Sequence, residues 1–156
     1  MASPGAAAMR DRTTNTVGAL LMFLLSPGAM ADRVQSPPSE RGRTVYQQYC
    51  AGCHGAKGEG VPGWERPDEH GELPAPPHDH TGHTWKHSDA MLYRIVQQGW
   101  RDPFNKTERS TMPGFKGQLS RQQTISVIAY LKSLWTSEQR QFQAQESRRQ
   151  PFPLSR

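Results

Sequence analysis

The chain has 156 residues, 34% of them hydrophobic, and a formal net charge of +5. The length fits one domain, and the basic excess is mild and unclustered, so the sequence predicts no nucleic-acid partner. Because 14 glycines and 13 prolines leave few large apolar side chains, a stable fold needs a further element such as a disulfide, a metal or a cofactor.

The first 31 residues are typical of a secretory signal peptide. A positive region with two arginines precedes an apolar stretch at residues 17–25, and residues 29–31 (AMA) match a cleavage site. The apolar stretch is shorter than the roughly twenty residues that a membrane-spanning helix needs. We therefore expect cleavage before Asp32, export to the periplasm, and no membrane insertion of the mature protein.

The next elements are a leader, a helix and a loop. Residues 32–38 are polar and end in two prolines, which predicts a flexible leader. A first helix is predicted from Ser39 toward the cysteines, because Ser39 can cap it and Val45 and Tyr49 share one face. Residues 55–86 are rich in glycine and proline and show no helical or strand period. They predict a long irregular loop, which in a compact domain indicates that it wraps something or serves a function.

Two further helices follow, so the predicted fold class is all-α. Ser88 can cap a short helix with one apolar stripe that ends at Gly99. Ser120 begins the strongest helical pattern, in which apolar residues recur at three- and four-residue spacing up to Trp135. Residues 136–156 are polar, and we expect there a frayed helical extension or a disordered tail.

The segment Cys50-Ala51-Gly52-Cys53-His54 has the pattern of covalent haem attachment. Two thiols three residues apart on a helical turn can reach the two vinyl groups on one haem edge, and His54 can then reach the iron. A disulfide, a thioredoxin-like redox pair or half of a zinc site are the alternatives for such a pair. The sequence shows no strand pattern around the motif and no third cysteine, which favours one covalent haem c.

The second axial ligand must come from elsewhere in the chain. Without the first 31 residues, the remaining methionines are Met91 and Met112. Met91 falls in the apolar stripe of a predicted helix, which favours a core role. Met112 lies in a loop beside Pro113, far enough from His54 for the chain to reach the opposite haem face, and is the predicted distal ligand. His/Met ligation raises the reduction potential.

Together these motifs resemble the class I mono-haem cytochromes c. The resemblance covers about residues 39–135 and includes the distal Met-Pro-Gly-Phe loop at residues 112–115 and a final amphipathic helix at residues 125–135. It implies a small cytochrome c-like haem domain, a single-electron carrier that is not an enzyme, and redox protein partners. It also implies that the N- and C-terminal helices cross beside the haem, at a place where aromatic residues often meet. Tyr46 and Tyr130 lie there, and Tyr49 is an equally plausible packing residue.

Five histidines fall within eighteen residues in and directly after the long loop, namely His70, His78, His80, His83 and His87. They predict either a copper or zinc site, or side chains that pack against the haem or bond its propionates while others are solvated. The loop also resembles small bacterial cytochromes that accompany copper-handling or respiratory oxidase systems, which implies an oxidase partner.

Two alternative functions stay open beside the electron carrier. One is a haem-based enzyme or small-ligand sensor, which needs an open or weakly ligated iron. The other is a copper-binding module in which the histidine loop is primary and the haem is redox-active. Met112 in its proline-stiffened loop favours the carrier, and the sequence shows no constellation for acid-base or nucleophilic catalysis outside the haem.

Overall fold

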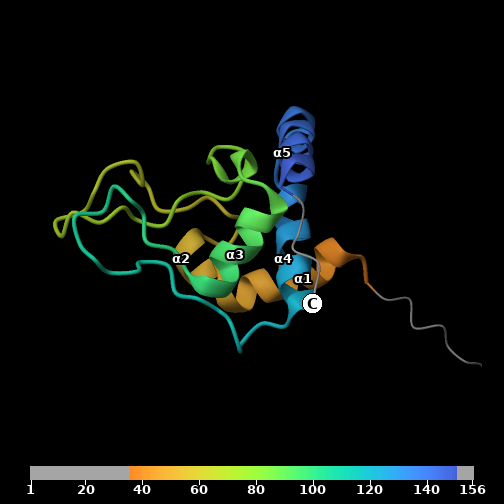
Figure 1. The fold of residues 1–156 in the computed structure, drawn as a ribbon, viewed down its shortest axis with the longest axis horizontal. Helices are drawn as coiled ribbons and strands as arrows, with labels where there is room; N and C mark the ends of the chain where they lie inside the picture. The colour runs from red at the N-terminus through yellow and green to blue at the C-terminus, as the bar shows by residue number, and fades with distance from the viewer. Residues whose placement is uncertain (1–35, 151–156) are drawn as a thin grey trace, which may run out of the picture. The chain divides into compact units, whose positions relative to one another are not determined.

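The structure is a computed structural model that describes residues 36–150. Its elements, in chain order, are α1 (Pro38–Tyr49), α2 (Ala51–His54), the short 3-10 helix η1 (Thr84–Lys86), α3 (Asp89–Gln98), α4 (Arg121–Ser133) and α5 (Ser137–Arg149) (Figure 1). Two isolated bridges are the only β-type pairings within this range, so the described chain is all-α, as predicted. None of its helices is long and apolar enough to cross a membrane. The predicted signal peptide and most of the leader lie outside the described residues.

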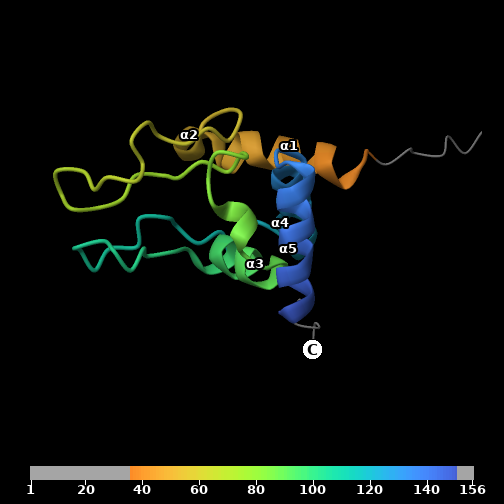
Figure 2. The same ribbon diagram turned by 90° about the horizontal axis from the view of Figure 1, so that it is seen from above.

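Helices α1 and α4 cross and pack more extensively than any other pair (Figures 1 and 2). Gly42 permits the close approach, because a Cβ at this position would lie 1.8 Å from the carbonyl oxygen of Ser126. One turn further along α1, the ring of Tyr46 is fully buried and its centroid lies 5.1 Å from that of Tyr130. The predicted contact between these two tyrosines is therefore confirmed.

The helix ends follow the capping residues. The hydroxyl of Ser88 accepts a backbone N–H from the first turn of α3, and α3 ends at Gly99, which has a φ of +80°. Ser120 and Gln123 form a capping box at the start of α4. These boundaries agree with the sequence prediction. Helix α1 begins at Pro38, because a proline suits the first helical turn. Its N-cap is Pro37 and no side chain makes a capping bond, so the predicted cap at Ser39 is wrong.

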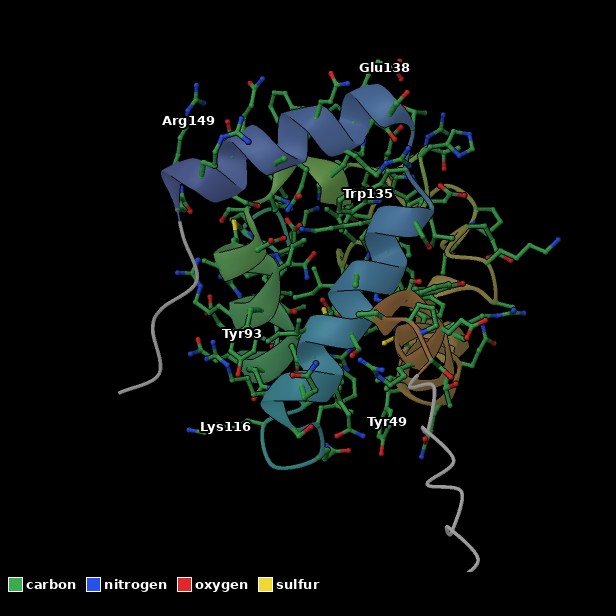
Figure 3. The ribbon with its side chains drawn as sticks, turned by 90° about the vertical axis from the view of Figure 1, so that its right-hand side faces the viewer. Tyr49, Tyr93, Lys116, Trp135, Glu138 and Arg149 are labelled. Atoms are coloured by element: carbon green, nitrogen blue, oxygen red, sulfur yellow. The ribbon has the colours of Figure 1, made fainter. Side chains whose placement is uncertain are left out.

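For residues 137–149 the structure agrees with the helical alternative predicted for the tail and contradicts the disordered one, because these residues form helix α5. A capping box joins Thr136 and Gln139 at the start of the helix. Figure 3 shows α5 running from Glu138 to Arg149 beside α3. The last residues, 151–156, lie outside the described range.

Buried hydrogen bonds hold α5 in place. The side chain of Gln143 is 1% exposed. Its amide donates to the backbone oxygen of His87, to Asp89 Oδ1 and to Ser147 Oγ, at 3.2, 2.7 and 2.9 Å. Lys132 of α4 contacts the same carboxylate, with 2.6 Å between Nζ and Asp89 Oδ1. Apolar periodicity could not reveal α5, because its contacts with the domain are largely polar.

The chain between α2 and η1 is irregular, as predicted for residues 55–86, except that residues 84–86 form η1. This loop folds back on itself, since the backbone N–H of Val61 donates to Ala75 and that of His78 donates to Gly58, at 3.0 and 2.7 Å. In both overall views it extends to the same side as the loop between α3 and α4 (Figures 1 and 2). The two loops therefore project from the helices toward the same side.

Candidate haem site

The two cysteines occupy the turn that continues α1 into α2. Both are free thiols, and Cys50 is partly buried while Cys53 is exposed. Burial, followed by the neighbouring Cys53, raises the pKa of the Cys50 thiol to about 11, so this thiol is protonated at neutral pH. The turn therefore places two thiols close together, and covalent haem attachment requires two such thiols.

His54 ends this turn with one ring nitrogen already committed. The residue is 6% exposed, and its Nδ1 lies 2.9 Å from the carbonyl oxygen of Pro76. A carbonyl oxygen can only accept, so Nδ1 carries the proton and Nε2 keeps its lone pair. Burial also lowers the pKa of the ring, which favours the neutral form. This arrangement is typical of a metal-binding histidine, because a second-shell acceptor fixes the tautomer and the ring orientation.

Tyr46 connects the motif to the helix crossing. Its hydroxyl donates to the backbone oxygen of Gly55 at 2.8 Å and to that of His54 at 3.3 Å. Burial raises the pKa of Tyr46, so the phenol stays protonated and remains a donor. The chain directly after the motif is therefore anchored to the most buried part of the α1 and α4 interface.

His78 packs directly against the candidate iron ligand. The rings of His54 and His78 stack with centroids 3.9 Å apart. The hydroxyl of Thr84 donates to Pro77 O at 3.3 Å and accepts from His78 Nδ1 at 2.8 Å. Burial, followed by the two nearby histidines, lowers the pKa of His78 well below its usual value. His78 is thus a neutral, oriented ring in the wall behind His54.

The other histidines do not assemble a metal site. His83 stacks on Trp64 at 5.3 Å and meets His87 edge-on at 5.4 Å, whereas the exposed His70 pairs with Glu69. Among residues 36–150, no group of three His, Cys, Asp or Glu side chains could hold a metal ion. The structure therefore gives the predicted copper or zinc site no ligand set.

The segment that carries Met112 is attached at both ends. Met112 and Trp100 exchange backbone hydrogen bonds of 3.0 and 3.1 Å. Gly99 makes this approach possible, because a Cβ there would lie 2.6 Å from the oxygen of Met112. Three residues further on, Phe115 meets Tyr49 edge-on at 6.1 Å. Tyr49 directly precedes Cys50, so the structure brings the Met112 segment to the end of α1 that bears the motif, with Met112 packed against the core.

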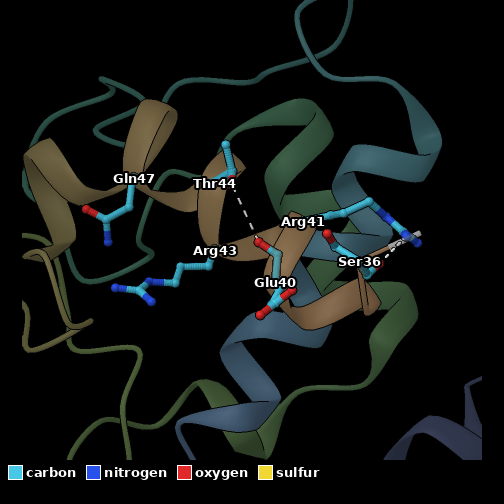
Figure 4. A pocket seen from close by; sticks show the side chains of 6 residues that line it. All are labelled: Ser36, Glu40, Arg41, Arg43, Thr44 and Gln47. Carbon is cyan, nitrogen blue, oxygen red and sulfur yellow. Dashed lines mark hydrogen bonds between the residues drawn. The ribbon is translucent and has the colours of Figure 1, made fainter. Parts of the chain in front are cut away.

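Two surface pockets lie elsewhere. One lies on α1 and is lined by Ser36, Glu40, Arg41, Arg43, Thr44 and Gln47 (Figure 4). The other includes Met91, Tyr93 and Gln150. Neither contains a residue of the haem-attachment motif or Met112, and Met91 lines a surface pocket rather than the buried core that the sequence predicted for it.

Sequence analysis missed the residues that support the site. Pro76 acts through its backbone oxygen, which any residue type could supply, so no sequence signal marks it. Glu72 is 4% exposed and accepts hydrogen bonds from Thr107 and Arg109 on the other loop. A single acidic residue in an irregular loop gives no pattern either. The start of α5, in contrast, could have been found from the Ser/Thr-x-x-Glu/Gln spacing at Thr136.

Comparison with known proteins shows to which family this chain belongs. The family model for cytochrome c matches residues 39–135, which is more than half of the chain. None of the curated proteins matches. Among solved structures, the chain is similar to cytochrome cL from the marine methylotrophic bacterium Methylophaga aminisulfidivorans. That similarity has 16% sequence identity and a TM-score of 0.43, covering 79% of this chain and 71% of that chain. The chain therefore belongs to the cytochrome c family, as an electron-transfer protein with one covalently attached haem c.

Proposed function

We propose that this protein carries single electrons with its haem joined to Cys50 and Cys53, and with His54 and Met112 as the axial ligands. One observation carries the proposal. Within the Cys-x-x-Cys-His turn, His54 is buried with its Nδ1 proton donated to Pro76, so that Nε2 is free for iron.

The protein's own residues would orient and shield the group. When bound, haem c supplies an iron that gains and loses one electron. Pro76 fixes the plane of the His54 ring, and Tyr46 fixes the backbone that follows it. The backbone pair between Trp100 and Met112 attaches the Met112 segment to the end of α3. If His54 and Met112 both bind the iron, these attachments would hold the two ligands in place and would favour electron exchange over binding of a substrate, which supports a carrier rather than a haem enzyme or sensor.

The proposal also includes export and a redox partner. Export rests on the signal-like residues 1–31, and a periplasmic protein cleaved at the predicted site would begin with Asp32. Without residues 1–31, which contain Arg10, Asp11 and Arg12, the formal charge is +4, and this basic excess suits an acidic partner surface such as that of a respiratory or copper oxidase. N-terminal sequencing of the protein purified from the periplasm tests the first part, since an intact N-terminus would contradict it.

The decisive experiment is to express the full chain with haem-attachment machinery and record its mass and its oxidised and reduced absorption spectra. We expect the mass to increase by one haem. In Cys50→Ser or Cys53→Ser, we expect the haem to be attached by a single thioether bond. We also expect the weak long-wavelength band of iron bound to methionine sulfur. Covalent haem without that band would contradict the Met112 ligand, and absence of covalent haem would contradict the whole proposal.

A pair of methionine variants assigns the distal ligand. Met112→Ala should abolish the long-wavelength band, lower the reduction potential and open the iron to added ligands. Met91→Ala is the matched control, because Met91 lines a surface pocket with Tyr93 and Gln150. Loss of the band in Met91→Ala and its retention in Met112→Ala would reverse the assignment.

A further inference from the structure

A buried carboxylate joins the loop after α2 to the loop between α3 and α4. Glu72 lies in the loop after α2, and its side chain is 6% exposed. Its two oxygens accept from Thr107 Oγ1 at 2.5 Å and from Arg109 at 3.1 Å (Nε) and 2.5 Å (Nη2). Both donors belong to the loop between α3 and α4. The carboxylate therefore bonds across to the opposite loop, and a paired geometry of this kind is what a buried charge requires.

Backbone and amide contacts extend the same junction. The N–H of Lys106 donates to Gly71 O at 2.9 Å, and the N–H of Leu73 donates to the side-chain oxygen of Asn105 at 2.7 Å. Asn105 is 4% exposed and donates in turn to Thr111 Oγ1 at 3.3 Å. We call Glu72, Asn105, Thr107 and Arg109 the loop clasp. Its contacts reach the residue directly before Met112.

The Glu72 side of the clasp is itself preorganised. The carboxylate of Asp68 accepts the backbone N–H groups of His70 and Glu72, each at 2.9 Å. These bonds fix the turn from which Glu72 projects. Hydrogen bonds from Thr107 and Arg109 lower the pKa of Glu72, so it is ionised at neutral pH and its pair with the guanidinium is intact.

The clasp joins the two segments that bear on the proposed axial ligands. Four residues after Glu72, Pro76 accepts the Nδ1 proton of His54. Three residues after Arg109, Met112 pairs with the backbone of Trp100. Loss of the clasp would leave the Met112 segment attached to α3 and to Tyr49 but free of the loop that orients His54. The Met112 segment would then separate more often from the loop that bears Pro76.

We propose that Glu72 is a positioning residue that joins the Met112 segment to the loop bearing Pro76 through Thr107 and Arg109. This inference rests on the proposed His54 and Met112 ligation. With haem bound, added imidazole would compete with Met112 for the iron. Its apparent affinity would therefore report how often Met112 is displaced. The clasp therefore controls how readily the iron accepts a foreign ligand.

The test is a titration of the oxidised, haem-loaded full chain with imidazole, followed by absorption. Glu72→Gln should bind imidazole about tenfold more tightly than the unaltered protein, the size of effect expected when a charge-assisted contact is removed. Glu108→Gln is the matched control, because Glu108 is 93% exposed and pairs with Arg101 on the same loop. It should bind imidazole as the unaltered protein does.

Further variants distinguish a positioning role of Glu72 from a general loss of stability. Gln143→Leu weakens the attachment of α5, away from the clasp, and should lower stability without changing imidazole affinity. Arg109→Lys keeps the charge but not the two-pronged contact, so its affinity should lie between those of the unaltered protein and Glu72→Gln. If Glu72→Gln does not fold, Thr107→Val removes one hydrogen bond and should still raise the affinity by a smaller factor.

The outcomes for the two proposals differ. If the unaltered protein shows the methionine band but the clasp variants bind imidazole no more tightly than Glu108→Gln, the clasp inference is overturned and the electron-carrier proposal stands. An equal rise in affinity in Gln143→Leu would also overturn it. If the unaltered protein lacks the band, the Met112 ligation itself fails.

Discussion

At the residue scale, the protonation state of His54 is decided by backbone geometry. The carbonyl of Pro76 takes the Nδ1 proton, and burial disfavours a second proton. The stacked His78 is held in the same way by Thr84. Both stacked rings are therefore neutral, although either imidazole in water would titrate near neutral pH.

Gly42 is the residue at which added volume should be felt most. An alanine Cβ would meet the backbone of Ser126 on α4, and backbone cannot rotate away as a side chain can. We expect Gly42→Ala to lower the free energy of unfolding by about 1–3 kcal/mol despite its better helix propensity. Denaturant unfolding followed by circular dichroism measures this. Thr44→Ala on the exposed face of α1 (Figure 4) is the control and should change it by less than about 0.5 kcal/mol.

Glu72 should give the protein an acid-sensitive component of stability. Its hydrogen bonds hold the folded-state pKa below the ordinary value of 4.5. A lowered folded pKa means that the contribution is complete above 4.5 and is lost as the pH falls through the folded value. The difference in unfolding free energy between the unaltered protein and Glu72→Gln should be constant from about pH 7 to pH 5 and shrink below that. A difference that stays constant at lower pH would contradict this.

Sequence reasoning can propose site residues at this scale where chemistry dictates the residue type. Thioether formation needs two cysteines, and iron needs an imidazole next to them, so Cys50, Cys53 and His54 could be named from the sequence. Pro76 and Glu72 could not be named. The first acts through a backbone atom, and the second has meaning only once two distant loops meet.

At the scale of elements, α5 extends the domain beyond the residues that match the family model. It packs on η1 and α3 through Gln143, and Phe142 meets Trp85 edge-on at 5.4 Å. Helices α3 and α4 were predictable because an apolar stripe and a capping serine coincide in each. Helix α5 lacks such a stripe, so its place depends on acceptors supplied by η1 and α3.

Replacing the amide at the centre of α5 should expose this dependence. Gln143→Leu conserves approximate volume but leaves His87 O and Asp89 Oδ1 without that donor. We expect the free energy of unfolding to fall by about 1–3 kcal/mol, the penalty for buried acceptors left unpaired. Chemical denaturation measures it. The exposed Gln145→Leu serves as the comparison, and an equal loss there would mean that burial is not the cause.

At the scale of the whole molecule, the positive net charge, which is +4 without residues 1–31, should govern encounters with charged reagents. Electrostatic attraction is screened over about 10 Å at 0.1 M salt. We expect the rate constant for oxidation by anionic ferricyanide to fall as salt is added, and that for a cationic cobalt complex to rise. Stopped-flow measurements with both reagents test this. Equal slopes would show that the positive charge does not face the site of electron exchange.

The crossing of α1 and α4 also has a kinetic consequence. The chain emerges from its amino end, so the turn with Cys50 and Cys53 exists long before residues 121–133. Gly42 and Tyr46 cannot bury their surfaces until those later residues arrive, and pairing across such a sequence distance forms slowly. The two thiols thus remain on an open segment for most of biosynthesis, and this interval gives a modifying enzyme access to them before the helices close.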